Sequence, residues 1–200
     1  MAKYLEVAGK ADRGLNWDSV RDEPYPGVMV YDMRNLPMKG VVDNTYDGIY
    51  SEHFIEHLTK DEGINFFKEA IRIMKPGGVI RTVWPPRDFV DFLNSSQDLS
   101  DHPFVKHYYD FYIVREKFAP PGTEHLSKQK QCAEGLLWQK GEHKYLWYKH
   151  EMVETLKSLG YKMVQEYAYM GSGVAAFRSI DTPGQIRAMH SAVIEATAPW

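Results

Sequence analysis

Residues 46–83 read YDGIYSEHFIEHLTKDEGINFFKEAIRIMKPGGVIRTV, and this stretch decides the fold. Its first five residues are a short strand candidate. Thr59 is a good helix N-cap with Glu62 three residues later, and apolar residues then recur at helical spacing until KPGG, residues 75–78, ends the helix. Residues 79–83 predict another strand. This order indicates a β-α-β unit, which implies a parallel sheet with a right-handed crossover.

Further strands are predicted upstream of this unit. Residues 4–8 form a short apolar run that ends at Gly9, residues 15–18 are a brief strand candidate, and residues 28–32 are a clearer one. The polar segment between residues 10 and 26 lacks the pattern of a full helix. The first part of the chain therefore alternates strands with loops.

The end of the chain predicts a helix, a hairpin and another helix. An amphipathic helix over residues 148–159 is followed by strand candidates at 161–169 and 174–179, which flank Gly171-Ser172-Gly173. Residues 182–197 predict a terminal helix, opened by Thr182 and Pro183. Its apolar stripe either completes the core or pairs two subunits as a homodimer; the stripe comprises Ile186, Met189, Val193 and Ala196.

Composition predicts one domain over residues 1–200. A chain of 200 residues with 44% hydrophobic content suffices for one core, and its net charge of −3 without basic blocks argues against a nucleic-acid partner. Cys132 is the single cysteine, the first residues do not resemble a secretory signal, and no apolar run is long enough to span a membrane. We therefore expect a cytoplasmic protein that does not enter membranes.

Residues 85–142 are predicted to be an insertion. Aromatic residues and histidines concentrate over residues 103–118 within it. These side chains would close as a lid over a ligand, stack a flat acceptor molecule, or pack as an ordinary core.

Three motifs in order resemble one family. DMRNLP at residues 32–37, YDGIYSEHFIEHL at 46–58 and RIMKPGG at 72–78 are similar to class I S-adenosylmethionine-dependent methyltransferases. In particular they resemble small predicted methyltransferases that read D-L-R-x-L-P, S-H-x-L-E-H and L-K-P-G-G. The resemblance implies a Rossmann-like α/β fold in three αβα layers, with a mostly parallel seven-stranded sheet and an antiparallel terminal strand. It also implies S-adenosylmethionine as the cofactor and S-adenosylhomocysteine as the product.

The resemblance places the cofactor at the carboxyl ends of the strands, as expected for an open α/β sheet. The loop Glu6-Val7-Ala8-Gly9-Lys10 would approach the ligand, with Gly9 giving close backbone access and Glu6 either facing the methionine ammonium or lying exposed. The loop carries one glycine where the family has several, so a catalytically silent binding or assembly module is a second hypothesis.

Four further residues complete the expected cofactor site. Asp18 resembles the carboxylate that accepts hydrogen bonds from both ribose hydroxyls, although loop aspartates also cap turns. The resemblance places Asp32 near the adenine amino group and Met33 against the adenine ring. In dinucleotide-binding folds in general, an acid about 20 residues past the glycine, such as Asp32, would instead bind the ribose hydroxyls. Ser51 follows the strand at residues 46–50 and would lie on the substrate side.

Two histidines are candidate bases for methyl transfer to oxygen or nitrogen of a small molecule or saccharide. His53 and His143 are the candidates because the imidazole group of histidine can accept a proton near neutral pH, and both residues also fit local packing. The spacing His53-x-x-Glu56-His57 matches a helical zinc motif and makes a zinc hydrolase a remote third hypothesis. Because the motif is embedded in the methyltransferase pattern, we expect no metal ligands.

Overall fold

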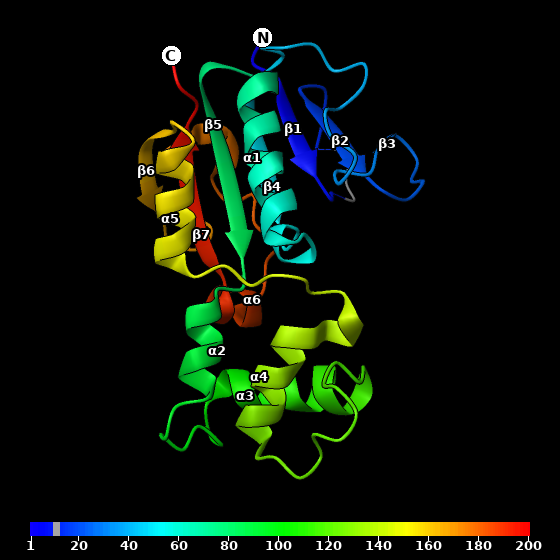
Figure 1. Ribbon diagram of the computed structural model, residues 1–200, viewed down its shortest axis with the longest axis vertical. Helices are drawn as coiled ribbons and strands as arrows, with labels where there is room; N and C mark the ends of the chain where they lie inside the picture. The colour runs from blue at the N-terminus through cyan, green and yellow to red at the C-terminus, as the bar shows by residue number, and fades with distance from the viewer. Residues whose placement is uncertain (10–12) are drawn as a thin grey trace.

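The structure is a computed structural model that describes residues 1–9 and 13–200. Within these residues, seven strands form one sheet in the order β3-β2-β1-β4-β5-β7-β6 (Figure 1). Neighbouring strands are parallel except that β7 is antiparallel to β5 and β6, which confirms the predicted sheet. The strands are β1 (Tyr4–Val7), β2 (Trp17–Arg21), β3 (Met29–Val30), β4 (Tyr46–Glu52), β5 (Met74–Trp84), β6 (Lys162–Glu166) and β7 (Ala192–Thr197).

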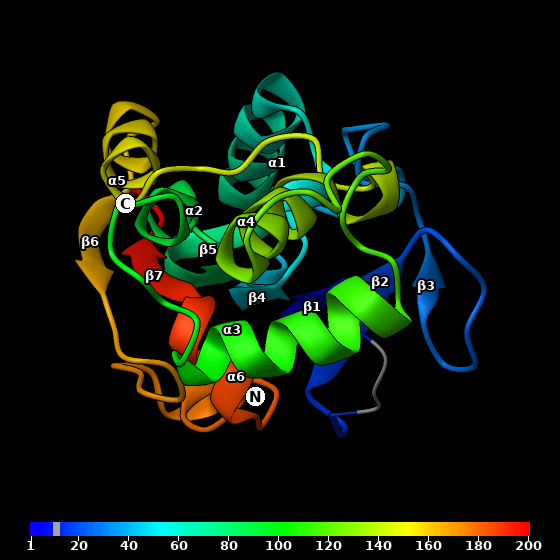
Figure 2. The same cartoon turned by 90° about the horizontal axis from the view of Figure 1, so that it is seen from below.

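Helices cover one face of the sheet and its carboxyl end. The α-helices are α1 (Lys60–Ile73), α2 (Arg87–Leu93), α3 (Pro103–Tyr108), α4 (Lys128–Trp138), α5 (Lys149–Ser158) and α6 (Gln185–His190). Figure 2 shows α1 and α5 on one side of the sheet. None of the helices in the described residues is long and apolar enough to cross a membrane.

The predicted β-α-β unit is confirmed. The Thr59 hydroxyl accepts from the Glu62 backbone N–H while the Glu62 carboxylate accepts from the Thr59 N–H at 2.8 Å, so both halves of the capping box are present. The buried face of α1 packs Phe66, Phe67 and Ala70 onto the sheet. This packing places the β4–α1 loop at the carboxyl edge of the sheet.

The other face of the sheet is covered by residues 167–181, which follow β6. The Phe177 ring is fully buried there among the rings of Tyr4, Trp17 and Tyr50. The predicted strand over residues 174–179 is wrong, because Ala175–Phe177 forms a 3-10 turn. The segment buries its aromatic ring by lying across the sheet instead of adding a strand to it.

The predicted terminal helix over residues 182–197 is wrong in its second half. α6 ends at His190, and Ala192–Thr197 is the antiparallel strand β7. Every residue of β7 is buried, because the strand lies inside the sheet with both faces covered. Such a strand has no polar alternation, so its apolar run matches a helical stripe equally well. Val193 and Ala196 therefore lie in the sheet and do not form a helical dimer face.

The predicted insertion forms a helical lobe beyond the carboxyl ends of β4 and β5 (Figure 1). It contains α2, α3, a π-helix over Tyr109–Arg115, α4 and a 3-10 turn over Gln139–Gly141. Phe104, Tyr108 and Leu136 belong to a hydrophobic cluster of the lobe's own. Much of the aromatic concentration therefore serves ordinary packing.

A buried ion pair joins the sheet to the segment that covers it. The Arg81 side chain on β5 is fully buried and donates to Asp181 Oδ1 at 2.9 Å, Glu195 Oε1 at 2.9 Å and the Gly171 carbonyl at 2.8 Å. A buried guanidinium is tolerated only when carboxylates and hydrogen bonds compensate it. Arg81 therefore connects three segments: β5, β7 and residues 167–181.

Replacement of Asp181 by asparagine should destabilise the fold strongly. Asp181→Asn leaves the Arg81 charge only partly compensated, and removing one partner of a buried pair typically costs about 3–5 kcal/mol. Urea unfolding at pH 7 measures the loss. Asp101→Asn is the matched control, because the Asp101–Lys106 pair is exposed and the free energy of unfolding should not change. Equal stability of the two variants would contradict a central role for Arg81.

Candidate active site

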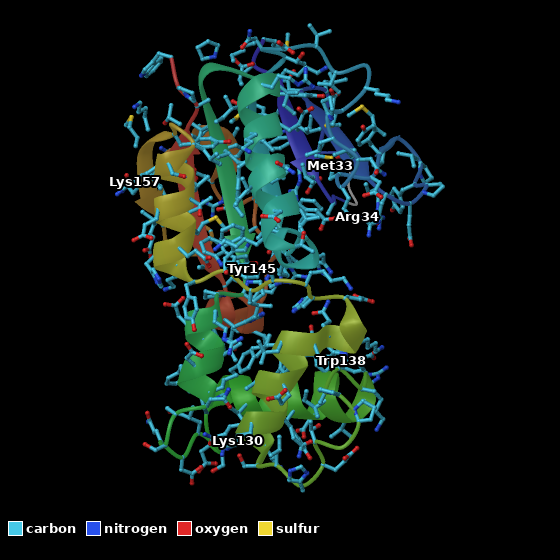
Figure 3. The ribbon with its side chains drawn as sticks, in the orientation of Figure 1. Met33, Arg34, Lys130, Trp138, Tyr145 and Lys157 are labelled. Carbon is cyan, nitrogen blue, oxygen red and sulfur yellow. The ribbon has the colours of Figure 1, made fainter. Side chains whose placement is uncertain are left out.

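A pocket of about 560 Å³ lies at the carboxyl ends of four parallel strands. It is lined by Ala8 after β1, by Asp22 and Glu23 after β2, by residues 31–34 after β3 and by His53 after β4. Residues 140–142 of the lobe and Lys144, just after it, add to the wall. Figure 3 shows Met33 and Arg34 beside the sheet, with Tyr145 at the junction and Trp138 in the lobe. The pocket therefore lies where open α/β sheets bind ligands.

The backbone after β1 turns sharply at Ala8. Its φ is +60°, in the left-handed region that favours glycine, and its N–H donates to the Val20 carbonyl at 2.8 Å. A residue as small as alanine leaves the backbone accessible from the pocket. Of the predicted loop residues, Ala8 lines the pocket, whereas Lys10 lies outside the described residues.

Glu6, Gly9 and Ser51 are not among the residues that line the pocket. The buried Glu6 carboxylate accepts from Arg13 Nε at 2.7 Å. Gly9 lies against this side chain, because a Cβ at Gly9 would be 2.2 Å from Glu6 Cδ. The Ser51 hydroxyl donates to the Thr82 hydroxyl at 3.3 Å inside the sheet. The Glu6 and Ser51 side chains are therefore directed into the fold, and Gly9 packs against Glu6.

The structure does not bring Asp18 to the pocket. Asp18 is near the start of β2, where it accepts from the Tyr46 hydroxyl at 2.8 Å and pairs with Lys3 at 2.7 Å. The acids that follow β2 at the pocket are Asp22 and Glu23, which sequence reasoning missed because it placed the strand at residues 15–18. A longer strand through the apolar Val20 would have placed Asp22 and Glu23 at the carboxyl end of the strand.

Asp32 and Met33, both predicted to contact the adenine, line the pocket. Asp32 accepts from the Arg34 backbone N–H at 2.9 Å and from Arg34 Nε at 2.8 Å. The Arg34 hydrogen bond holds the pKa of Asp32 below its ordinary value. Met33 is buried and offers the pocket an apolar wall.

A second cavity of about 230 Å³ adjoins the first, and His53 and His57 line both. Its other walls come from the lobe, from the β4–α1 loop and from α6; they include Glu56, Tyr108, Tyr112, Phe118, His143, Arg187 and His190. The lobe and the sheet therefore enclose it jointly.

His53 lies between the two cavities. Its backbone N–H donates to the Val83 carbonyl at 2.9 Å, and its φ of +50° directs the chain sharply out of β4. Nε2 is 2.9 Å from the Ser191 hydroxyl, and Nδ1 is 3.3 Å from Glu56 Oε1. Both ring nitrogens thus face polar partners that set the orientation of the ring.

The remote zinc-hydrolase hypothesis requires His53 and His57 on one helical face, and the structure does not place them there. Only Ile55–His57 is helical, as a single 3-10 turn, and His53 precedes it in a left-handed conformation. His57 instead packs edge-to-face on His143, with ring centroids 5.0 Å apart. The arrangement that the zinc-hydrolase hypothesis requires does not form.

Burial changes the titration of two other histidines. Burial lowers the pKa of His143, and its Nδ1 donates to the Leu136 carbonyl. Burial also lowers the pKa of His190 to about 3, with the His53 ring acting in the same direction. Both side chains are therefore neutral at pH 7.

Comparisons with known proteins agree with this geometry. Residues 7–82 match the model of the methyltransferase domain family. A SAM-dependent methyltransferase from Archaeoglobus fulgidus is 14% identical and has a TM-score of 0.56, over 98% of this chain and 86% of that one. The CurJ carbon methyltransferase is 13% identical with a TM-score of 0.52, over 100% of this chain and 49% of that one. The structural likenesses show a shared fold.

A curated protein also matches in sequence. This protein, an NADH-quinone oxidoreductase component from Geobacter sulfurreducens, is 32% identical over 124 residues. The match covers 59% of this chain but only 28% of that protein. The matched part thus spans about a quarter of that relative's length.

The sheet order, the pocket at the strand ends and the match over residues 7–82 show that the chain has the Rossmann-like fold of S-adenosylmethionine-dependent methyltransferases.

The depressed pKa of His190 predicts acid lability. Between the folded pKa of about 3 and the ordinary value of 6.5, the unfolded chain binds a proton that the folded chain does not, so stability falls as the pH falls through this window. The slope is about 1.4 kcal/mol per pH unit for one proton. His190→Phe fits among the rings of Phe89 and Phe104 and should reduce the slope of urea-unfolding free energy between pH 6 and pH 4.5. An unchanged slope would show that other groups cause the acid loss.

Proposed function

We propose that the protein transfers the methyl group of S-adenosylmethionine to an oxygen or nitrogen of a small molecule or saccharide. The observation that carries this proposal is the junction of the two cavities at His53. The larger pocket suits the cofactor and the smaller one the acceptor. A histidine at the junction would contact both partners of the transfer.

The larger pocket fits the adenosyl part of the cofactor. Asp22 and Glu23 offer pairs of acceptor oxygens at the end of β2, and two acceptors match the two ribose hydroxyls. Met33 offers an apolar contact for a flat ring, and the neighbouring Asp32 offers an acceptor for an amino group. The donor and acceptor set of the pocket therefore complements a nucleoside.

His53 is the proposed base. S-adenosylmethionine supplies, when bound, a methyl group already activated on a sulfonium, so the protein needs mainly to position the partners and accept a proton. A lone pair on His53 would take the proton that the acceptor hydroxyl or amine gives up. Glu56 next to Nδ1 would stabilise the resulting imidazolium. His143, the other predicted base, lines only the smaller cavity.

Loss of a carboxylate after β2 should weaken cofactor binding. Asp22→Asn and Glu23→Gln each remove charge from the proposed ribose contacts, and a hydrogen bond to a charged group is worth about 1.5–3 kcal/mol. Titration calorimetry with S-adenosylhomocysteine should show affinity reduced about tenfold or more in at least one of them. Asp18→Asn is the control, because Asp18 lies at the other end of β2 and its variant should bind normally. Loss of affinity in Asp18→Asn alone would contradict the assignment.

Replacement of His53 should separate catalysis from cofactor binding. His53→Asn removes the base, and general-base catalysis typically contributes about 10²–10⁴-fold. S-adenosylhomocysteine release, assayed against a panel of hydroxyl- and amine-bearing acceptors, should fall by at least about 100-fold while cofactor affinity stays unchanged. The exposed His150→Asn serves as control. Full turnover in His53→Asn would remove it as the base.

A silent binding module is the second candidate, and the Glu6–Arg13 ion pair favours it. Arg13 Nη2 lies 2.6 Å from Glu6 Oε1, so this carboxylate is already neutralised within the fold. The same calorimetry decides between the two candidates. Saturable binding of S-adenosylhomocysteine supports the enzyme, and absence of binding at millimolar ligand supports the silent module.

A further inference from the structure

Glu56 is a buried carboxylate without hydrogen-bond donors. The side chain is completely buried, and among the described residues neither carboxylate oxygen accepts a hydrogen bond. The 3.3 Å contact of Oε1 with His53 Nδ1 brings the two groups together without hydrogen-bond geometry. A buried carboxylate normally has either donors or a cation beside it. Apart from the contact with His53, Glu56 therefore has no hydrogen-bond donor among the described residues to offset its buried charge.

His143 presents a free lone pair in the same cavity. Its Nδ1 donates to the Leu136 carbonyl, which fixes the tautomer and leaves Nε2 unprotonated. Nε2 is buried and has no hydrogen-bond partner among the described residues. A histidine held through one nitrogen by a backbone carbonyl, with the other nitrogen free, has the usual arrangement of a metal ligand.

His57 completes a set of three. One ligand atom each from Glu56, His57 and His143 lie within 4.8 Å of one another. Two bonds of about 2.1 Å to a shared ion span at most about 4 Å, so small side-chain rotations would bring all three atoms into contact with it. The near-perpendicular His57 and His143 rings, at 84°, are already adjacent.

We propose that Glu56, His57 and His143 bind a divalent transition-metal ion of the Zn²⁺ class. Two imidazole nitrogens and one carboxylate are ligands that such ions prefer, whereas Mg²⁺ prefers oxygen ligands and retained water. The ion compensates the Glu56 charge and gives the Nε2 lone pair of His143 a partner. Its remaining coordination position opens into the 230 Å³ cavity and would accept an oxygen or nitrogen of a small molecule.

This metal site is different from the helical zinc motif. It uses Glu56 as a ligand and takes its second histidine from beyond α4, whereas His53 faces Ser191. The site is independent of whether the larger pocket binds cofactor. Metal binding can therefore be measured on the protein alone.

Calorimetric titration of EDTA-treated full-length protein with Zn²⁺ tests the proposal. The wild type should bind one ion at micromolar or lower dissociation constant, and its thermal unfolding temperature should rise with Zn²⁺. His57→Asn and His143→Asn should each reduce affinity at least about 100-fold. Because His57 is only partly buried, His57→Asn keeps the test valid if His143→Asn fails to fold. Co²⁺ loading provides an absorption spectrum that reports nitrogen ligation.

The controls are His125→Asn and His150→Asn, which replace exposed histidines and should bind Zn²⁺ like the wild type. Two results would overturn the proposal: no saturable binding at micromolar Zn²⁺, or equal binding by His57→Asn and the wild type. Neither result depends on S-adenosylhomocysteine, so failure of the metal site is distinguishable from failure of the methyltransferase proposal.

Discussion

The ion pair between Arg81 and Asp181 is the contact on which the rest of the structure depends. A guanidinium in a central strand is too costly to bury without carboxylates, so Asp181 must stay against the sheet. The next residue, Thr182, donates its backbone N–H to Glu52 at 3.0 Å, at the end of β4. From there α6 leads the chain back to the ring of His53. The charge buried at the centre of the sheet thereby positions the proposed base at its carboxyl edge.

The part of the sheet next to the larger pocket is built from loops. None of the described residues between β1 and β3 is helical, and the face opposite α1 and α5 is covered by residues 167–181 (Figure 2). The helical lobe supplies the wall that these loops do not provide. Lys140 and Lys144 bring cations to a pocket whose β2 side carries Asp22 and Glu23. Ligand binding in this pocket should therefore depend on the lobe as much as on the sheet.

Helix caps and hydrophobic periodicity in the sequence predicted the elements that depend on interactions between neighbouring residues. The Thr59 cap and the helical spacing predicted α1 and the adjoining strands, because caps and periodicity act within a few residues. β7 was missed, since a strand covered on both faces has no alternation. The second strand was predicted to end at Asp18, whereas β2 runs to Arg21. Asp22, at the carboxyl end of β2, was therefore missed. The pairing of His57 with His143 joins distant segments, and no spacing rule reports such a contact.

The H-x-x-E-H motif shows why spacing alone does not assign chemistry. On an α-helix, His53 and His57 would face the same side, but here a left-handed residue and a single 3-10 turn separate their rings. His53 turns toward Ser191, His57 turns toward His143, and Glu56 lies buried between them. One carboxylate can then orient a base through one oxygen and hold a cation through the other. Removing Glu56 would impair both roles together, whereas the two histidines allow each role to be examined separately.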